Sequence, residues 1–463
     1  MERPNPITKS YPVFDCDAHI DEPLEIWDYV PESERDLVRA TYWRDEHGGV
    51  LNGTTRVFAG GNEFWAPSYN PVCIAGPQMN KKIMRKLLLT QLSDEQRDYV
   101  VHRGAFDPHA RVGDMDLMGI DQVLVIPTAV VVNLPFARNA RGAAVFARAY
   151  NTWLRDWCDA VPDRLFGAAV LPPDPALAAE EVRYAAEHGF PVALIRPIEG
   201  ITGYPNDIGA AMTADDPRLP PTFDAVFRAF EERDLCLGMH TQAAGAMTAM
   251  PIPGQLVSPG DLLGRARVGS ETLSFVFEAQ TWLGQVLLSG FLDRCPRLRM
   301  LIFESNSQWL PYLLETCDRL FRLYANEREI PATRLPSEAF YEQCAISFES
   351  DESPTFRQWR AFEDIGIWAS DVYHHDGADA WSAIRELQNA GVPDAVQEKL
   401  MGGNARRLYG IEGKVFVTDE PGPIPRPNWF PQGAAFDEWC ELVAHPRENA
   451  DRLREFETAR QRP

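Results

Sequence analysis

The chain has 463 residues, of which 45% are hydrophobic, and it carries a formal net charge of -22 at pH 7. This acidic balance argues against nucleic-acid binding, which needs basic patches, and against attachment to an anionic membrane surface. No run of about 18 apolar residues occurs, so we expect no transmembrane helix.

The first expected strand is an apolar run at residues 13–20 that contains Asp17 and His19. Side chains alternate between the two faces of a strand, so Asp17 and His19 lie on the same face and can approach one metal ion. Taken alone, the pair is better explained as a turn cap and an ordinary polar residue at a strand end.

Residues 24–110 separate this strand from the next one and are rich in aromatic side chains. A structureless loop of that length is uncommon in a compact domain, so we expect this insertion to be partly ordered. Three roles remain open for it: a cover over a substrate pocket, a lateral cap and a dimer interface.

From about residue 112 onward, strand-like apolar runs alternate with helical patterns. Further strands are expected at residues 122–127, 165–172, 192–197, 235–240, 298–304, 345–349 and 367–371. Helices are expected at residues 137–161, 174–188, 222–233, 270–294, 307–325 and 378–390. Eight strands separated mostly by helices favour a distorted (β/α)8 TIM barrel of the α/β class over an open doubly wound sheet.

Two regions follow from this pattern. Residues 1–413 form the barrel with its insertion at 24–110. Residues 414–463 form a C-terminal extension, first proline-rich and then helical near 434–462, which packs on the barrel or on a partner subunit. We expect a homodimer that acts on a small molecule.

The eight cysteines are scattered without a CxxC pair. This pattern is typical of reduced thiols in a cytoplasmic protein, and the first residues show no signal-peptide pattern.

Further candidate site residues follow the fifth and last strands. His240 ends the fifth strand, Asp371 ends the last one, and His374 lies close behind it. With Asp17 and His19, these residues place carboxylates and imidazoles at the carboxyl ends of three strands, where barrel enzymes keep their active sites. Mixed oxygen and nitrogen donors favour one or two divalent transition-metal ions such as zinc, iron or manganese.

The Asp-x-His and Ser-Asp motifs resemble those of the amidohydrolase superfamily. Further matching segments lie at residues 114–121, 151–153, 164–167, 295–298, 370–376 and 403–410. Together they resemble the amidohydrolase-related branch that includes aminocarboxymuconate semialdehyde decarboxylase and the resorcylate-type decarboxylases. This resemblance implies a divalent metal held by Asp17, His19, His240 and Asp371.

One position departs from that branch. Relatives often carry a histidine at the end of strand six, whereas this chain has Glu304. Glu304 is a candidate fifth metal ligand or general base, or else the partner of a barrel arginine such as Arg196. We expect Glu22 and Glu349 to orient ligands or to serve the fold.

Three functions are compatible with these residues. The first is hydrolysis of an ester, thioester or amide of a bulky, largely apolar substrate by a metal-activated water, with Asp371 as general base and His374 steadying the oxyanion or the leaving group. The alternative is metal-dependent, non-oxidative decarboxylation of an aromatic or enol carboxylic acid. The third, an inactive barrel used as a scaffold, is disfavoured because all four expected ligands are present. The sequence favours hydrolysis.

Overall fold

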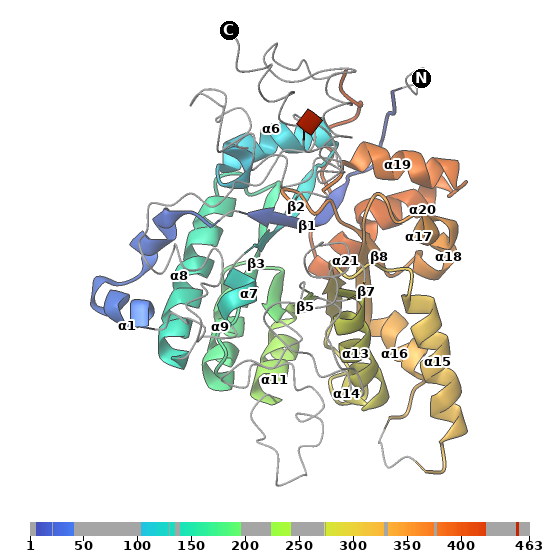
Figure 1. Cartoon of the computed structure of the whole chain (residues 1–463), viewed down its shortest axis with the longest axis horizontal. Helices are drawn as coiled ribbons and strands as arrows, with labels where there is room; N and C mark the ends of the chain where they lie inside the picture. Colours follow the sequence, from blue (N-terminus) through green and yellow to red (C-terminus); the bar gives the residue numbers. More distant parts are fainter. Residues whose placement is uncertain are drawn as a thin grey trace.

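Eight parallel strands form one sheet in which each strand pairs with the next one along the chain (Figure 1). The strands are β1 (Phe14–Ile20), β2 (Gln122–Pro127), β3 (Leu165–Val170), β4 (Val192–Ile195), β5 (Cys236–His240), β6 (Met300–Phe303), β7 (Cys344–Phe348) and β8 (Gly366–Trp368). The chain beyond β8 meets β1, because the amide of Asp371 donates to the carbonyl of Asp17 at 3.0 Å. The sheet is therefore a nearly closed barrel, and the predicted (β/α)8 fold is confirmed.

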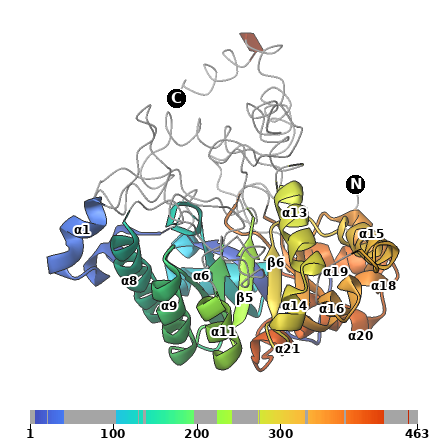
Figure 2. The same cartoon turned by 90° about the horizontal axis from the view of Figure 1, so that it is seen from below.

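The computed structural model describes residues 6–20, 22–40, 103–128, 130–134, 139–195, 224–241, 273, 275–327, 332–374, 377–422 and 451–452. Helices follow most strands and surround the barrel (Figures 1 and 2). They are α1 (Arg35–Ala40), α6 (Pro108–Met118), α7 (Val130–Asn133), α8 (Ala140–Cys158), α9 (Pro175–Glu187), α11 (Asp224–Arg233), α13 (Phe275–Leu288), α14 (Phe291–Arg294), α15 (Leu310–Leu323), α16 (Pro336–Gln343), α17 (Ser353–Arg357), α18 (Trp359–Phe362), α19 (Ala380–Asn389), α20 (Asp394–Glu398) and α21 (Asn404–Tyr409). Short 3-10 or π segments are η1 (Leu24–Tyr29), η2 (Glu32–Glu34), η3 (Arg103–Ala105) and η7 (Lys399–Gly403).

Two predicted elements differ from the structure. The helix expected at 270–294 is divided into α13 and α14, because Gly290 between them adopts a φ of 73° that ends the first helix. The last strand ends at Trp368, three residues earlier than expected, so Asp371 lies in the following loop.

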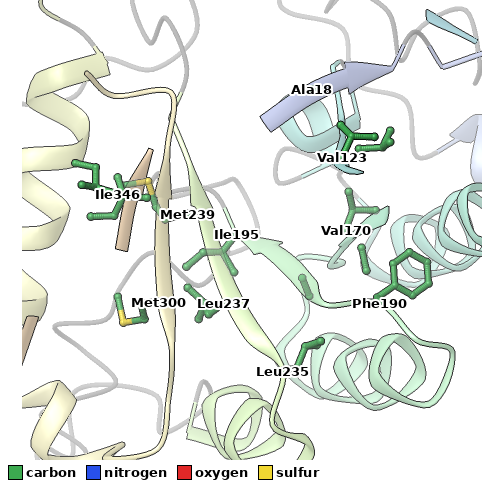
Figure 3. Close-up of a cluster of buried hydrophobic side chains, with 14 of the residues drawn as sticks. Ala18, Val123, Val170, Phe190, Ile195, Leu235, Leu237, Met239, Met300 and Ile346 are labelled. Atoms are coloured by element: carbon green, nitrogen blue, oxygen red, sulfur yellow. The ribbon is translucent and has the colours of Figure 1, made fainter. Parts of the chain in front are cut away.

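Two apolar clusters pack on opposite faces of the sheet. The outer cluster lies between strands and helices, and Figure 3 shows part of it, with Ile195 and Leu237 on neighbouring strands. The inner cluster fills the barrel with alternate residues, among them Leu124 and Phe303. Gly238 faces this interior, where a Cβ would lie 2.8 Å from three side chains on β4 and β6. The inner residues pack as a core, so only the ends of the barrel can hold a site.

The direction of the side chains on β1 changes along the strand. Phe14 and Cys16 belong to the inner cluster, whereas Ala18 and Ile20 belong to the outer one. The pairing of β1 with β2 shifts register between Asp15 and Ala18, and such a bulge re-aims the side chains that follow it. Residues 17 and 19 therefore point into the barrel mouth.

The chain segments before β1 and after α21 pair beneath the barrel, at its amino-terminal end. Thr8 and Asp419 form an antiparallel bridge. The buried carboxylate of Asp121 pairs with the ammonium group of Lys9 and accepts hydrogen bonds from the amides of Phe416 and Val417 at 2.6 and 2.9 Å. The start of the predicted extension thus packs on the barrel, while its predicted helix at 434–462 lies outside the described residues except for 451–452.

Other expectations concern the insertion, the thiols and membranes. Residues 24–40 of the insertion pack on α8 (Figure 1). The hydroxyl of Tyr29 donates to Oδ2 of Asp156 at 3.1 Å. The aromatic residues of the insertion between 42 and 99 lie outside the described residues. The cysteines at 16, 158, 236, 295, 317 and 344 are free thiols, as predicted. Among the described helices, none is both long and apolar enough to cross a membrane.

The Asp121 cluster leads to a stability prediction. Asp121→Asn leaves the buried ammonium of Lys9 uncompensated, which costs about 3–5 kcal/mol. Urea unfolding followed by circular dichroism measures this loss. The control is Asp163→Asn, which breaks the exposed pair with Lys414 and costs at most about 1 kcal/mol. Equal unfolding midpoints for the two variants would contradict the role given to Asp121.

Candidate metal centre

Four buried polar side chains meet at the carboxyl ends of the barrel strands. Asp17 and His19 lie near the end of β1, His240 is the last residue of β5, and Asp371 follows β8. All four are at most 3% exposed. The structure therefore brings together the residues that the sequence predicts as metal ligands.

The donor atoms are spaced as metal ligands are. Nε2 of His19 lies 3.4 Å from Oδ1 of Asp17 and 3.3 Å from Oδ1 of Asp371. Nε2 of His240 lies 3.7 Å from Oδ2 of Asp17. Ligands about 2.1 Å from one ion stand roughly 3 to 3.5 Å apart. One oxygen or nitrogen atom each from Asp17, His19 and His240 all lie within 4.8 Å of one another, so these residues fit a divalent cation.

The two imidazoles present the same ring nitrogen to the centre. Nδ1 of His240 donates to the carbonyl of Thr241 at 2.6 Å, because a carbonyl oxygen can only accept. Nδ1 of His19 lies 3.3 Å from the hydroxyl of Thr128. Such partners orient a metal-binding histidine and leave the lone pair of Nε2 directed at the ion.

His374 extends the centre on the side of Asp371. Its Nδ1 lies 2.8 Å from Oδ1 of Asp371, and its ring stacks on that of His19 at 3.8 Å. His19, Asp371 and His374 form a second group of potential ligands. Because His19 belongs to both groups, they describe a single centre.

Glu304 reaches the same centre from the end of β6. Its Oε2 lies 3.6 Å from Nε2 of His240, and its side chain is 12% exposed. The backbone adopts a φ of 43°, a left-handed conformation that is uncommon for glutamate, and a hydrogen bond from its amide to the hydroxyl of Ser347 holds it there. A third carboxylate therefore faces the candidate ligands. Arg196, the alternative partner, lies outside the described residues.

The other two glutamates have contacts that serve the loops. Oε1 of Glu22 accepts the amide of Val130 at 2.9 Å and so joins the loops after β1 and β2. The amide of Glu349 donates to Glu352, whose carboxylate also accepts the amide of Ser307 at 2.7 Å. Buried Glu352 thus joins the loops after β6 and β7, a role that the sequence analysis missed.

Asp15 is a second residue that the sequence analysis missed. Its carboxylate accepts hydrogen bonds from the amide of Ser370 at 2.9 Å, from its hydroxyl at 2.5 Å and from the amide of Asp17. Burial raises the pKa of Asp15 to about 7, although the bonds from Ser370 oppose this. Burial, with the charge of Asp15, also raises the pKa of Asp17 well above its ordinary value. The spacing of residues 15, 17 and 19 was the only available signal.

A family model described as amidohydrolase matches residues 14–411. The chain belongs to the amidohydrolase family. No curated protein matches this amidohydrolase. The match to the family model covers the whole barrel and confirms the predicted membership. The candidate metal centre lies within the matched residues.

Solved structures share the fold at low sequence identity. An amidohydrolase from Mycobacterium avium subsp. paratuberculosis K-10 is 18% identical with a TM-score of 0.60, covering 87% of this chain and 100% of its own. The 5-carboxyvanillate decarboxylase from Sphingomonas paucimobilis is 21% identical with a TM-score of 0.54 and the same coverage. A dihydroxybenzoic acid decarboxylase from Polaromonas sp. JS666, solved with manganese and 2-nitroresorcinol, is 17% identical with a TM-score of 0.52, covering 87% and 97%.

The geometry predicts the metal content of variants. We expect His240→Ala to bind Mn²⁺ more than about 100-fold more weakly than the unmodified protein, because it loses a ligand and not merely an orienting partner. Elemental analysis and calorimetric titration measure this. His188→Ala, which removes an imidazole stacked on Tyr184 at the end of α9, serves as the control and should bind normally. Normal binding by both variants would remove His240 from the ligand set.

Proposed function

We propose that this amidohydrolase is a metal-dependent decarboxylase of an aromatic or enol carboxylic acid, with Asp17, His19, His240 and Asp371 as the metal ligands. The sequence favours hydrolysis, but the fold comparisons support the alternative, since two of the three similar structures described above are named decarboxylases. Manganese in one of them supports that ion over zinc or iron as the first choice. We also expect the homodimer predicted above.

The contact between Asp371 and His374 meets the need of this reaction for a proton. Decarboxylation replaces a carboxyl group on carbon by a proton, so the site must hold a proton donor beside the substrate. Asp371 borders the candidate metal position and contacts His374, whose side chain is 16% exposed. A proton can therefore pass from solvent through His374 to the carboxyl group of Asp371.

The reaction follows from these positions. A divalent ion held by Asp17, His19, His240 and Asp371 would supply a Lewis acid for the acidic substrate. Asp371 gives its proton to the carbon that bears the carboxylate. The bond to the carboxylate carbon then breaks, its electron pair returns to the ring or enol system, and carbon dioxide leaves. His374 returns a proton to Asp371.

Acyl hydrolysis is the second candidate because of Glu304. A carboxylate beside His240, in place of the histidine often found in relatives, can accept a proton from an attacking water. It also adds negative charge that opposes binding of a carboxylate substrate. The manganese-loaded protein should be assayed with hydroxylated benzoic acids for carbon dioxide, and with esters, thioesters and amides for acid release. Acid release without carbon dioxide would overturn the decarboxylase proposal.

The role of Asp371 predicts the outcome of a conservative substitution. Asp371→Asn removes the ionisable group and keeps its shape, so kcat should fall by about 10²–10⁴-fold. Circular dichroism should show an unchanged fold. A rate close to that of the unmodified protein would exclude Asp371 as the proton donor.

Substitution of Glu304 separates the two candidate reactions. For a carboxylate substrate, Glu304→Gln removes a repulsive charge and should lower KM several-fold. It should leave the chemical step unchanged, because Glu304 accepts no proton in decarboxylation. For hydrolysis, the same change should lower kcat by about 10²-fold or more. Glu363→Gln, which removes a carboxylate paired with Lys399 away from the centre, is the control. A lower metal content of Glu304→Gln alone would identify Glu304 as a ligand.

A further inference from the structure

A buried guanidinium group lies against the backbone of a candidate metal ligand. Arg111, in α6, is 1% exposed. Its Nη2 donates to the carbonyl of His19 at 2.6 Å, and its Nε donates to the carbonyl of Gly104 at 2.6 Å. Burying a charged group costs several kcal/mol unless its contacts offset this. Arg111 is bonded to the backbone of His19, so the buried charge stabilises the segment that carries this candidate ligand.

The same guanidinium lies on the ring of Tyr373, two residues after Asp371. The Cζ of Arg111 is 4.4 Å from the ring centroid, a favourable cation–π arrangement. The hydroxyl of Tyr373 donates to Oδ2 of Asp114 at 2.5 Å. A Cβ on residue 104 would lie 2.0 Å from this carboxylate oxygen and 2.2 Å from the hydroxyl, so a larger residue there would have to displace this bonded pair. Arg111 and Tyr373 are therefore held in one arrangement.

These contacts connect the ligands of β1 with the ligand after β8. The amide of His19 donates to the carbonyl of Val372, and its carbonyl accepts the bond from Arg111. The amide of His19 thus bonds the segment that carries Asp371 and Tyr373 directly. Its carbonyl is connected to the same segment through Arg111, which stacks on Tyr373. Across this connection, Nε2 of His19 lies 3.3 Å from Oδ1 of Asp371.

We propose that Arg111 is a positioning residue, which together with Tyr373 sets the distance between the metal ligands of β1 and Asp371. This inference rests on the metal centre of the proposed function and not on the reaction catalysed there. Arg111 acts through the backbone of His19 and does not touch the metal. Replacement by lysine keeps the charge, but a single ammonium group cannot reproduce the fork that donates to two carbonyls while stacking on a ring.

The test compares Arg111→Lys with a matched variant at the opposite end of the barrel. Arg164 is also buried, donates to the carbonyls of Ile120 and Asp121 and lies 4.7 Å from the ring of Phe416. Manganese affinity of the full chain is measured by calorimetry, the Mn²⁺ spectrum by electron paramagnetic resonance, and stability by unfolding in chelator. Arg111→Lys should weaken Mn²⁺ binding about 10–100-fold and change the spectrum. Arg164→Lys should lower stability alone.

Unchanged Mn²⁺ affinity and spectrum in Arg111→Lys would overturn the inference. If that variant does not fold, Tyr373→Phe decides, because it keeps the ring and loses only the bond to Asp114. It should bind Mn²⁺ several-fold more weakly, and normal binding would contradict the proposal. A failure of the unmodified protein to bind Mn²⁺ would instead contradict the assignment of the metal centre. Normal metal binding without decarboxylation would contradict only the proposed reaction.

Discussion

The candidate metal centre depends on the closure of the barrel between its first and last strands. Asp17 and Asp371 are far apart in the chain, and a hydrogen bond between their backbones brings them side by side. The carboxylate of Asp15 repeats this link through Ser370. Because several bonds cross the same seam, the backbone holds the two carboxylates and His19 at ligand spacing, which is how proteins preorganise a metal site.

Burial of acidic groups at this seam is energetically unfavourable, and a bound cation would offset it. Burial raises the pKa of Asp17 well above its ordinary value, which favours the protonated form. A divalent cation beside Asp17 would favour the charged form of this carboxylate instead. The loop conformations point the same way: Glu304 and Asp371 both adopt positive φ values, of 43° and 51°, and such strain is typical of functional sites.

The balance between decarboxylation and hydrolysis depends on the groups around a common metal site. Asp371 and His374 provide a proton path that either reaction can use. Glu304 adds a carboxylate beside His240, which favours activation of water and opposes an anionic substrate. The fold is shared by enzymes of different chemistry, so the reaction is decided by these side chains and not by the barrel.

The sequence by itself determined the eight strands and the barrel fold class, because apolar periodicity is a property of short segments. It also placed Asp17, His19, His240 and Asp371 at or near the ends of strands, and the resemblance to the amidohydrolase superfamily predicted them as metal ligands. Only the tertiary structure decided that a bulge turns Asp17 and His19 inward. The same holds for the approach of Glu304 to His240 and for the hydrogen bond from Arg111 to the carbonyl of His19. Each of these depends on register or on contact between distant segments. A pattern read along one strand contains no information on either, so no reading of the sequence could have supplied them.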